Sequence, residues 1–254
     1  MNYIVNASTN VGIARENNQD SVIAQLAKNG RHSFLLAAVC DGMGGLSGGE
    51  IASATVVFAL KSWFHKQCNS ITKDTTINAL SESCSAMLAE LNEHLKAYEI
   101  QHRSLMGTTM SCFVALDEAY TIIHIGDSRI YRIDKNLTQL TTDHKIVAEA
   151  VAAGLMTAEE AAVSNERNKL SQCMGASKRY DPEVLFGTAK KGDVFLICSD
   201  GFRHRLSEEE LHKGFQGKAL KDDSSIRKVC ENAIACVMER KEKDNISVAV
   251  IKAN

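Results

Sequence analysis

Two aspartates follow apolar runs and precede a glycine: Asp41 in "AAVCDGMGG" and Asp200 in "FLICSDGF". Such runs predict buried strands, so each carboxylate would stand at the end of a strand. Carboxylates that share one place repel each other, and they cannot easily all stay ionised unless a cation lies between them. Oxygen ligands without His or Cys beside them favour Mg²⁺ or Mn²⁺ over zinc. The two segments therefore predict a site for divalent cations.

Other aspartates occupy loop positions before or between predicted strands. Taken singly, each is compatible with an ordinary turn residue, because aspartate side chains bond readily to the backbone of a turn. In combination they suggest further ligands for the same site. They are Asp20 in "RENNQDS", Asp127 in "GDSR", Asp143 in "LTTDHK" and Asp244 in "KDNIS".

The residues after Asp41 permit two further interpretations. "LSGGE" (46–50) resembles the signature of ABC-type ATPases, but that signature only completes a site formed by a phosphate-binding Gly-x-x-x-x-Gly-Lys-Ser/Thr loop. The sequence has no such loop, since its one Gly-Lys pair (217–218) is followed by Ala. Asp41 and Gly42 could instead form a hairpin turn, which should lead straight into a second strand. Residues 43–49 are mostly glycine and precede a helical pattern, so the end of a strand is favoured.

Apolar, β-rich runs predict the strands that would position these residues. They span residues 33–40, 109–116, 120–126, 129–133, 193–199 and 246–252. Longer segments repeat apolar residues every three or four positions, as amphipathic helices do. We expect these helices at residues 50–64, 76–98, 145–163 and 224–238. Within the third, Thr157 and Glu160 have the spacing of a capping box.

The order of these elements predicts an α+β fold. Consecutive strands joined by short polar turns, as in "ALDEAYT" (115–121), indicate antiparallel pairs rather than repeated βαβ units. The sequence contains one proline, and it shows no internal repeat or linker-like tract. We therefore predict a single domain over residues 1–254.

Composition and charge exclude several classes of function. The 29 basic and 31 acidic residues give a net charge of −2, so no overall field favours nucleic acid or an anionic membrane. The eight cysteines occur singly, without a Cys-x-x-Cys pair, and this favours a reducing cytoplasm. The N-terminus lacks the features of a signal peptide, and no run approaches the ~18 apolar residues that span a membrane.

The motifs, taken in order, resemble those of the metal-dependent protein phosphatases, the type 2C Ser/Thr phosphatases, and in particular the compact bacterial branch of that family. They run from "VGIARENNQDS" (11–21) through "CDGMGG", "MGTTM", "IGDSRIYRI", "LTTDHK" and "CSDGF" to "KDNISVAVI" (243–251). The resemblance implies a four-layer αββα sandwich, in which two antiparallel sheets are flanked by helices. It also implies that residues 145–174 form a helical flap beside the metal site.

The resemblance implies two Mg²⁺ or Mn²⁺ ions in the active site. Asp41 would bridge them, and the Gly42 carbonyl would complete the coordination of one ion. Asp200 and Asp244 would hold the other ion. A water that bridges two such ions has a lowered pKa, so hydroxide would be available near neutral pH to attack phosphorus. The catalytic residues would be these three carboxylates together with Arg15.

Three further positions correspond to functional residues of the family. Asp20 matches an acidic residue that contacts the metal cluster through water. Asp143 matches a carboxylate that binds a third, weaker metal in bacterial relatives. Arg15 matches the arginine that grips the substrate phosphate, where its planar fork makes paired hydrogen bonds that Lys could not match.

The sequence departs from the family pattern at two positions. Met43 stands where many eukaryotic members have a His that is thought to protonate the leaving group. The acid is therefore unassigned, with a metal-bound water or His144 as candidates. Gln19 stands where relatives usually carry Glu, which removes one negative charge near the metals. Asp127 and Arg129 could also be catalytic, but we interpret them as a structural ion pair.

The resemblance implies a cytoplasmic, Mg²⁺- or Mn²⁺-dependent phosphatase that acts on phosphoserine and phosphothreonine in proteins and reverses the work of a Ser/Thr kinase. Its partners would be phosphorylated substrates of that kinase, without nucleic acid or membrane, and we expect a monomer. One alternative is a phosphatase of small phosphate esters. Another is a non-catalytic binding module, which predicts that ligands have been lost. The carboxylates are all present, at Asp20, Asp41, Asp143, Asp200 and Asp244.

Overall fold

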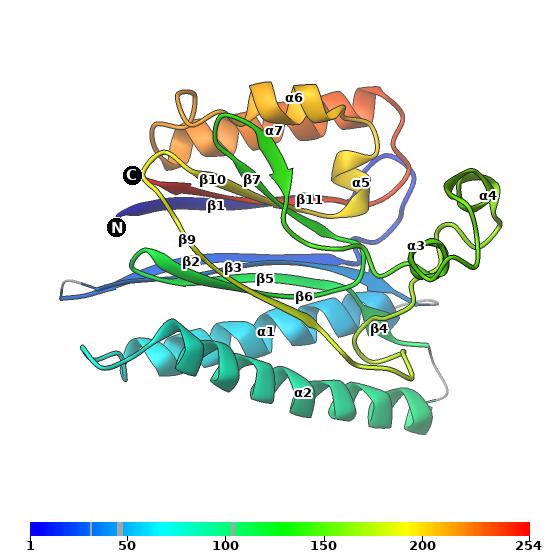
Figure 1. Cartoon of the computed structure of the whole chain (residues 1–254), viewed down its shortest axis with the longest axis horizontal. Coiled ribbons are helices and arrows are strands. Elements are labelled where there is room, and N and C mark those ends of the chain that lie inside the picture. Colours follow the sequence, from blue (N-terminus) through cyan, green and yellow to red (C-terminus); the bar gives the residue numbers. More distant parts are fainter. Residues whose placement is uncertain (31, 45–47, 103–104) are drawn as a thin grey trace.

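A computed structural model describes residues 1–30, 32–44, 48–102 and 105–254 of the chain. Two antiparallel sheets lie face to face, and helices cover the outer face of each sheet (Figure 1). This arrangement confirms the predicted α+β fold and its four αββα layers. Within the described residues, no helix is both long and apolar enough to cross a membrane.

Each sheet combines strands from distant parts of the chain, and all of their pairings are antiparallel. The first sheet has the order β1 (Tyr3–Asn10), β11 (Ile246–Ala253), β10 (Val194–Cys198), β7 (Arg129–Ile133) and β8 (Leu137–Gln139). The second has the order β2 (Asp20–Asn29), β3 (His32–Met43), β5 (Met110–Leu116), β6 (Ala119–Ile125) and β9 (Glu183–Thr188). The short β4 (Gly107–Thr108) pairs with the end of β3.

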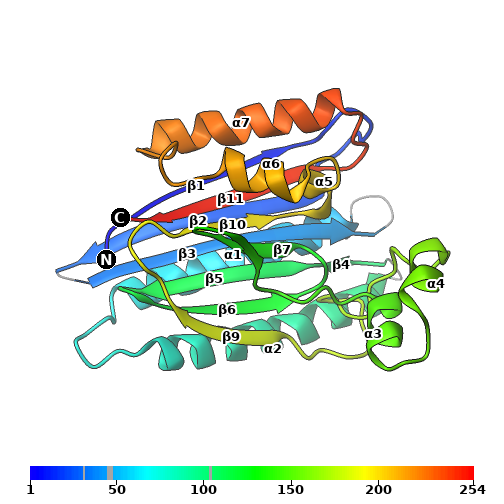
Figure 2. The same ribbon diagram turned by 45° about the horizontal axis from the view of Figure 1, so that its top comes forward.

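The helices fall into three groups (Figures 1 and 2). The long helices α1 (Gly48–Cys68) and α2 (Ile77–His102) cover the second sheet. The first sheet is covered by α5 (Asp200–Arg203), α6 (Glu208–Gly214) and α7 (Asp223–Glu239). At one end of the sandwich lie α3 (Ile146–Ala152) and α4 (Ala158–Val163), opposite the two chain termini.

The central strands bury both of their faces, which explains their continuous apolar runs. Side chains alternate across a strand, so neighbouring residues enter different layers of the core. Leu36 packs against the α1 and α2 side, whereas Leu35 lies between the sheets. Likewise Leu196 packs on the side of α6 and α7, and Phe195 lies between the sheets. The sandwich therefore has three apolar layers, and its ends are the places where polar side chains can gather.

The predicted strands and helices are all present, with small differences at their ends. The helical segment predicted at 145–163 is divided into α3 and α4 around Gly154, which has a φ of 70°. The capping box of Thr157 and Glu160 is confirmed at the start of α4. Strands β1, β2, β4, β8 and β9 and the short helices α5 and α6 are additional to the prediction. The residues of β1, β2 and β9 are mostly half-buried and those of β8 mostly exposed, so none of these four strands forms a continuous apolar run.

Candidate metal centre and active site

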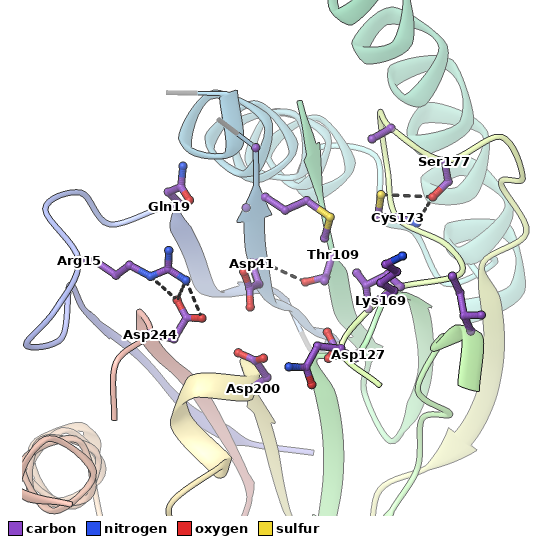
Figure 3. A pocket seen from close by; sticks show the side chains of 17 residues that line it. Arg15, Gln19, Asp41, Thr109, Asp127, Lys169, Cys173, Ser177, Asp200 and Asp244 are labelled. Atoms are coloured by element: carbon purple, nitrogen blue, oxygen red, sulfur yellow. Dashed lines mark hydrogen bonds and ion pairs between the residues drawn. The ribbon is translucent and has the colours of Figure 1, made fainter. Parts of the chain in front are cut away.

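A cavity of about 540 Å³ opens at the end of the sandwich that carries α3 and α4. The end of β3 in the second sheet, residues beside the strands of the first sheet, and the segment 145–174 contribute to its wall. Figure 3 shows the carboxylates of Asp41, Asp200 and Asp244 directed toward one space, with Asp127 beside them. The remaining side of the wall includes Ile146, Asn168, Lys169, Leu170, Cys173, Ala176 and Ser177.

Asp41 is held by backbone pairing on both sides of its strand. It lies opposite Asp20 in the pairing of β2 with β3. On the other side its N–H donates to Thr109 Oγ1 at 3.0 Å, and its carbonyl accepts from the Thr109 N–H at 2.8 Å. The strand was predicted to end at Asp41, but β3 continues to Met43 because β4 pairs with its last residues. The predicted glycine loop at 43–49 includes residues 45–47, which lie outside the described residues.

Gly42 occupies a position where no side chain fits. A Cβ atom there would lie 2.2 Å from the Gly49 carbonyl oxygen and 2.5 Å from the Gln19 carbonyl oxygen. The Gly42 N–H also donates to the Gln19 carbonyl at 3.1 Å. Close packing of three backbone segments therefore requires glycine beside Asp41.

We expect Gly42→Ala to destabilise the protein by about 1–3 kcal/mol and to displace Asp41, because the added methyl group overlaps backbone atoms that cannot rotate away. Urea denaturation and Mn²⁺ titration would measure the two effects. Gly214→Ala is the matched control, since a Cβ at Gly214 would have no atom within 4 Å. Equal stability of the two variants would contradict the packing argument.

Asp200 lies just after one buried strand, and Asp244 lies just before another. Asp200 begins α5, directly after β10 and the N-cap residue Ser199. Asp244 lies two residues before β11, next to Asn245. The Asn245 amide donates to the Val11 and Asn17 carbonyls at 2.9 and 3.1 Å, and its oxygen accepts from the Gln19 N–H at 2.8 Å.

Asn245 therefore fastens the N-terminal segment that carries Arg15 beside Asp244. Sequence reasoning missed this role, although Asn245 stands inside the quoted motif "KDNIS". It also missed Thr109, which belongs to the motif "MGTTM". In both cases the motif was recognised, but the hydrogen-bond partners are distant in the sequence.

Arg15 forms a bidentate ion pair with Asp244 at the mouth of the cavity (Figure 3). Its Nε donates to Oδ1 at 3.1 Å and its Nη2 donates to Oδ2 at 3.0 Å. The Arg15 side chain is 52% exposed, so the guanidinium can leave this pair without moving the backbone. Planar guanidinium groups bind carboxylate and phosphate oxygens in the same geometry.

Three carboxyl groups in this cluster have raised pKa values. Burial raises the pKa of Asp20 from 3.8 to about 7, against the opposing hydrogen bonds from Ser247 and Ser199. Burial and the charge of Asp20 raise the pKa of Asp41 well above its ordinary value. Burial and the charge of Asp127 raise the pKa of Asp200. The cluster holds more negative charge than its surroundings stabilise.

Two buried oxygens of the cluster also have no hydrogen-bond partner: Asp20 Oδ2 and Asp200 Oδ1. Unpartnered buried oxygens beside an excess of negative charge are what a divalent cation would satisfy. The donor set consists of oxygen atoms, which fits Mg²⁺ or Mn²⁺. Among the described residues, however, no group of three or more His, Cys, Asp or Glu side chains forms a ready-made ligand set, and Asp244 is bound to Arg15.

Asp143 is not brought to this cavity. Its carboxylate accepts hydrogen bonds from Arg129 Nε at 2.7 Å and Nη2 at 2.8 Å, and Arg203 lies 3.7 Å away. Burial alone would raise the pKa of Asp143, but the hydrogen bonds and charge of Arg129 outweigh burial and lower it. The position predicted to bind a third metal is thus already neutralised by arginine.

The predicted ion pair between Asp127 and Arg129 is wrong. Arg129 binds Asp143, whereas Asp127 lines the cavity and binds Lys145 Nζ at 2.9 Å. Asp127 precedes the start of β7 and follows Gly126, whose φ is 112°, so the alternation of a regular strand does not relate the two side chains.

The two departures from the family pattern, Gln19 and Met43, both line the cavity. His144 lines a second cavity, together with Glu149 and Glu183. Its Nδ1 accepts from the Gly126 N–H at 3.2 Å, and burial lowers its pKa. These contacts are those of a structural histidine rather than of an acid facing the carboxylates.

Comparisons with known proteins agree on one family. The sequence profile described as "Protein phosphatase 2C" matches residues 13–238. The chain is 32% identical over 252 residues to the protein phosphatase PhpP of Streptococcus pneumoniae, covering 97% of this chain and 96% of PhpP. The fold matches the serine/threonine phosphatase of S. agalactiae with a TM-score of 0.82, at 24% identity and full coverage of both chains. It matches the catalytic domain of the phosphatase PstP in complex with two manganese ions with a TM-score of 0.74, at 27% identity and full coverage of both chains.

Proposed function

This chain belongs to the protein phosphatase 2C family, and from that premise we propose that it hydrolyses phosphoserine and phosphothreonine in proteins with the help of two Mg²⁺ or Mn²⁺ ions. The observation that carries the proposal is the cluster of under-neutralised carboxylates at the floor of the cavity, with an arginine fork at its mouth. Such a site can hold cations and, next to them, a phosphate group.

We assign the cations to Asp41, the Gly42 carbonyl, Asp200 and Asp244. Asp20, which lies opposite Asp41 in the sheet, would support them from the buried side. The bound ions supply an activated water and neutralise charge on the phosphate. The protein contributes rigid placement: sheet pairing fixes Asp41, and the start of α5 fixes Asp200.

Arg15 would change partners during the reaction cycle. In its present position it neutralises Asp244, and that carboxylate must become free before it can bind a cation. The released guanidinium, at the mouth of the cavity, would then bind two oxygens of the substrate phosphate. Arg15 thereby orients the phosphate toward the carboxylate cluster.

We expect Arg15→Gln to lower kcat/KM about 10- to 100-fold, mainly through a higher KM, because it removes charged hydrogen bonds to the substrate. Arg15→Lys should recover little of the loss, since an ammonium group cannot form the paired contacts. Steady-state kinetics on a phosphothreonine peptide would measure both variants, and Mn²⁺ titration should show binding at least as tight as in the unaltered protein. An unchanged KM for Arg15→Gln would contradict this role.

Phosphorylated proteins are the substrates that follow from the family, and we propose that these are the products of a Ser/Thr kinase. We further propose a monomer that acts in the cytoplasm. Buried thiols support a reducing compartment, since such cysteines need to stay reduced to pack as small apolar side chains. They are Cys40, Cys84, Cys112, Cys173, Cys198 and Cys230.

Phosphate release from a phosphothreonine peptide tests the proposal, measured with Mn²⁺, with Mg²⁺ and with a chelator. Glucose 6-phosphate serves as a small-ester substrate in a parallel assay. Metal-dependent turnover that favours the peptide would support a protein phosphatase. Preference for the sugar phosphate would identify a small-ester phosphatase, and a folded protein without turnover would identify a binding module.

A further inference from the structure

The two sides of the cavity differ in how their carboxylates are neutralised. On one side, the carboxylates outnumber the basic side chains. Arg15 is the one Lys or Arg in the described ranges that forms an ion pair with this group, and it does so at the exposed mouth. The group consists of Asp20, Asp41, Asp200 and Asp244.

On the other side, where Asp127 lines the cavity and Asp143 lies outside it, basic side chains outnumber the carboxylates. Asp143 is bound by both nitrogens of the Arg129 fork. Asp127 is bound by Lys145 Nζ at 2.9 Å. Arg203 lies between them, 3.7 Å from the Asp143 carboxylate and 4.0 Å from that of Asp127, and it donates to the Asp127 carbonyl at 3.2 Å. Three basic side chains therefore neutralise two carboxylates.

Backbone contacts hold Lys145 close to Asp127. It is the N-cap residue of α3, and its backbone forms an isolated β-bridge with Leu170, near the end of the segment 145–174. Its N–H also donates to the Asp143 carbonyl at 3.1 Å. The side chains of Lys145 and Asp127 are 15% and 9% exposed, so water screens their ion pair little.

Asp127 lines the same cavity as Asp41 and Asp200, and it would otherwise be a further oxygen ligand beside them. We propose that Lys145 acts as a built-in cation on this side of the cavity and limits the site to two divalent ions. The inference rests on the proposed function, since it concerns the metals of that site. In this proposal, the ammonium group of Lys145 takes the place of the third metal that the resemblance implies.

Counting bound ions tests the inference directly. Isothermal titration of the metal-free protein with Mn²⁺ should give two ions per chain for the unaltered protein. Lys145→Ser should bind three ions, with the third bound more weakly, because Asp127 loses the ammonium group that neutralises it. Lys145→Arg should remain at two, and the double variant Lys145→Ser with Asp127→Asn should return to two.

Lys169→Ser is the matched control. Lys169 lines the same cavity from the same segment, but it pairs with Glu166 at 2.8 Å instead of with a carboxylate of the cavity. It should therefore stay at two ions although its charge change is identical. Circular dichroism of each metal-free variant shows whether it is folded.

Three ions in the unaltered protein, or two in folded Lys145→Ser, would overturn the inference. If Lys145→Ser does not fold, Asp127→Asn alone decides the question: two ions retained support the built-in cation, and the loss of one ion shows that Asp127 is a metal ligand. These results differ from failure of the proposed function, which would appear as no Mn²⁺ binding and no turnover in the unaltered protein.

Discussion

We expect Asp200→Asn to lower the turnover of a phosphothreonine peptide by about 10³-fold or more, because it would remove a proposed cation ligand and charge stabilisation by a metal is worth several kcal/mol. The same substitution should stabilise the metal-free protein. Asp200 has a raised pKa and a buried oxygen without a partner, so its negative charge opposes folding when no cation is present. Steady-state kinetics with Mn²⁺ and urea denaturation with a chelator would measure the two opposite effects.

Asp74→Asn provides the control for this substitution. Asp74 is exposed in the loop between α1 and α2, and it makes the same change of one carboxylate to an amide. We expect it to leave both activity and metal-free stability unaltered. If Asp200→Asn lost activity but also lost metal-free stability, the carboxylate would be a structural group, and the argument from crowded negative charge would fail.

The metal-free protein should lose stability as the pH rises from about 6.5 to 8, by on the order of 1 kcal/mol or more. Burial raises the pKa of Asp20 to about 7 and that of Asp41 well above its ordinary value. In this range the folded protein therefore holds protons that the unfolded chain has already lost, so raising the pH favours unfolding. Saturating Mn²⁺ should reverse the slope, because ions bind the deprotonated carboxylates.

The pH range must be chosen with care, because at lower pH the buried histidines make stability increase, rather than decrease, as the pH rises. Burial lowers the pKa of His124 from 6.5 to about 4, which makes the folded state more stable as the pH rises through that interval. This contribution levels off about one pH unit above 6.5, the pKa of the unfolded state. Urea denaturation at closely spaced pH values, with and without Mn²⁺, would separate the contribution of the carboxylates from that of the histidines. Metal-free stability that stays level or increases up to pH 8 would contradict the raised pKa values.

The sequence predicts the fold well where strands are buried on both faces. Leu35 and Leu36 enter different apolar layers, so their run is continuous and the strand is evident. Edge strands are a different case. The side chains of β9 alternate between half-buried and exposed, and β1 includes Asn6, Ser8 and Thr9, so neither has the apolar signal of a core strand.

For the candidate site, residues within a motif were easier to predict than partners between motifs. Asp41 and Asp200 follow apolar runs, and both line the cavity. The partners of Asp127 and Asp143 were not predictable, because Arg203 approaches both from α5 and Lys145 binds Asp127 from the start of α3. The spacing within "GDSR" suggested an ion pair between Asp127 and Arg129, but in the fold each of them binds a different partner.

The position of β11 affects when the protein can become active during its synthesis. This strand leaves the ribosome after all the other described strands, yet it lies inside the first sheet, between β1 and β10. Asp244 and the clamp residue Asn245 are made just before it. A nascent chain that stops short of these residues has neither a closed sheet nor a complete set of carboxylates. We therefore expect phosphatase activity only after translation has passed this segment.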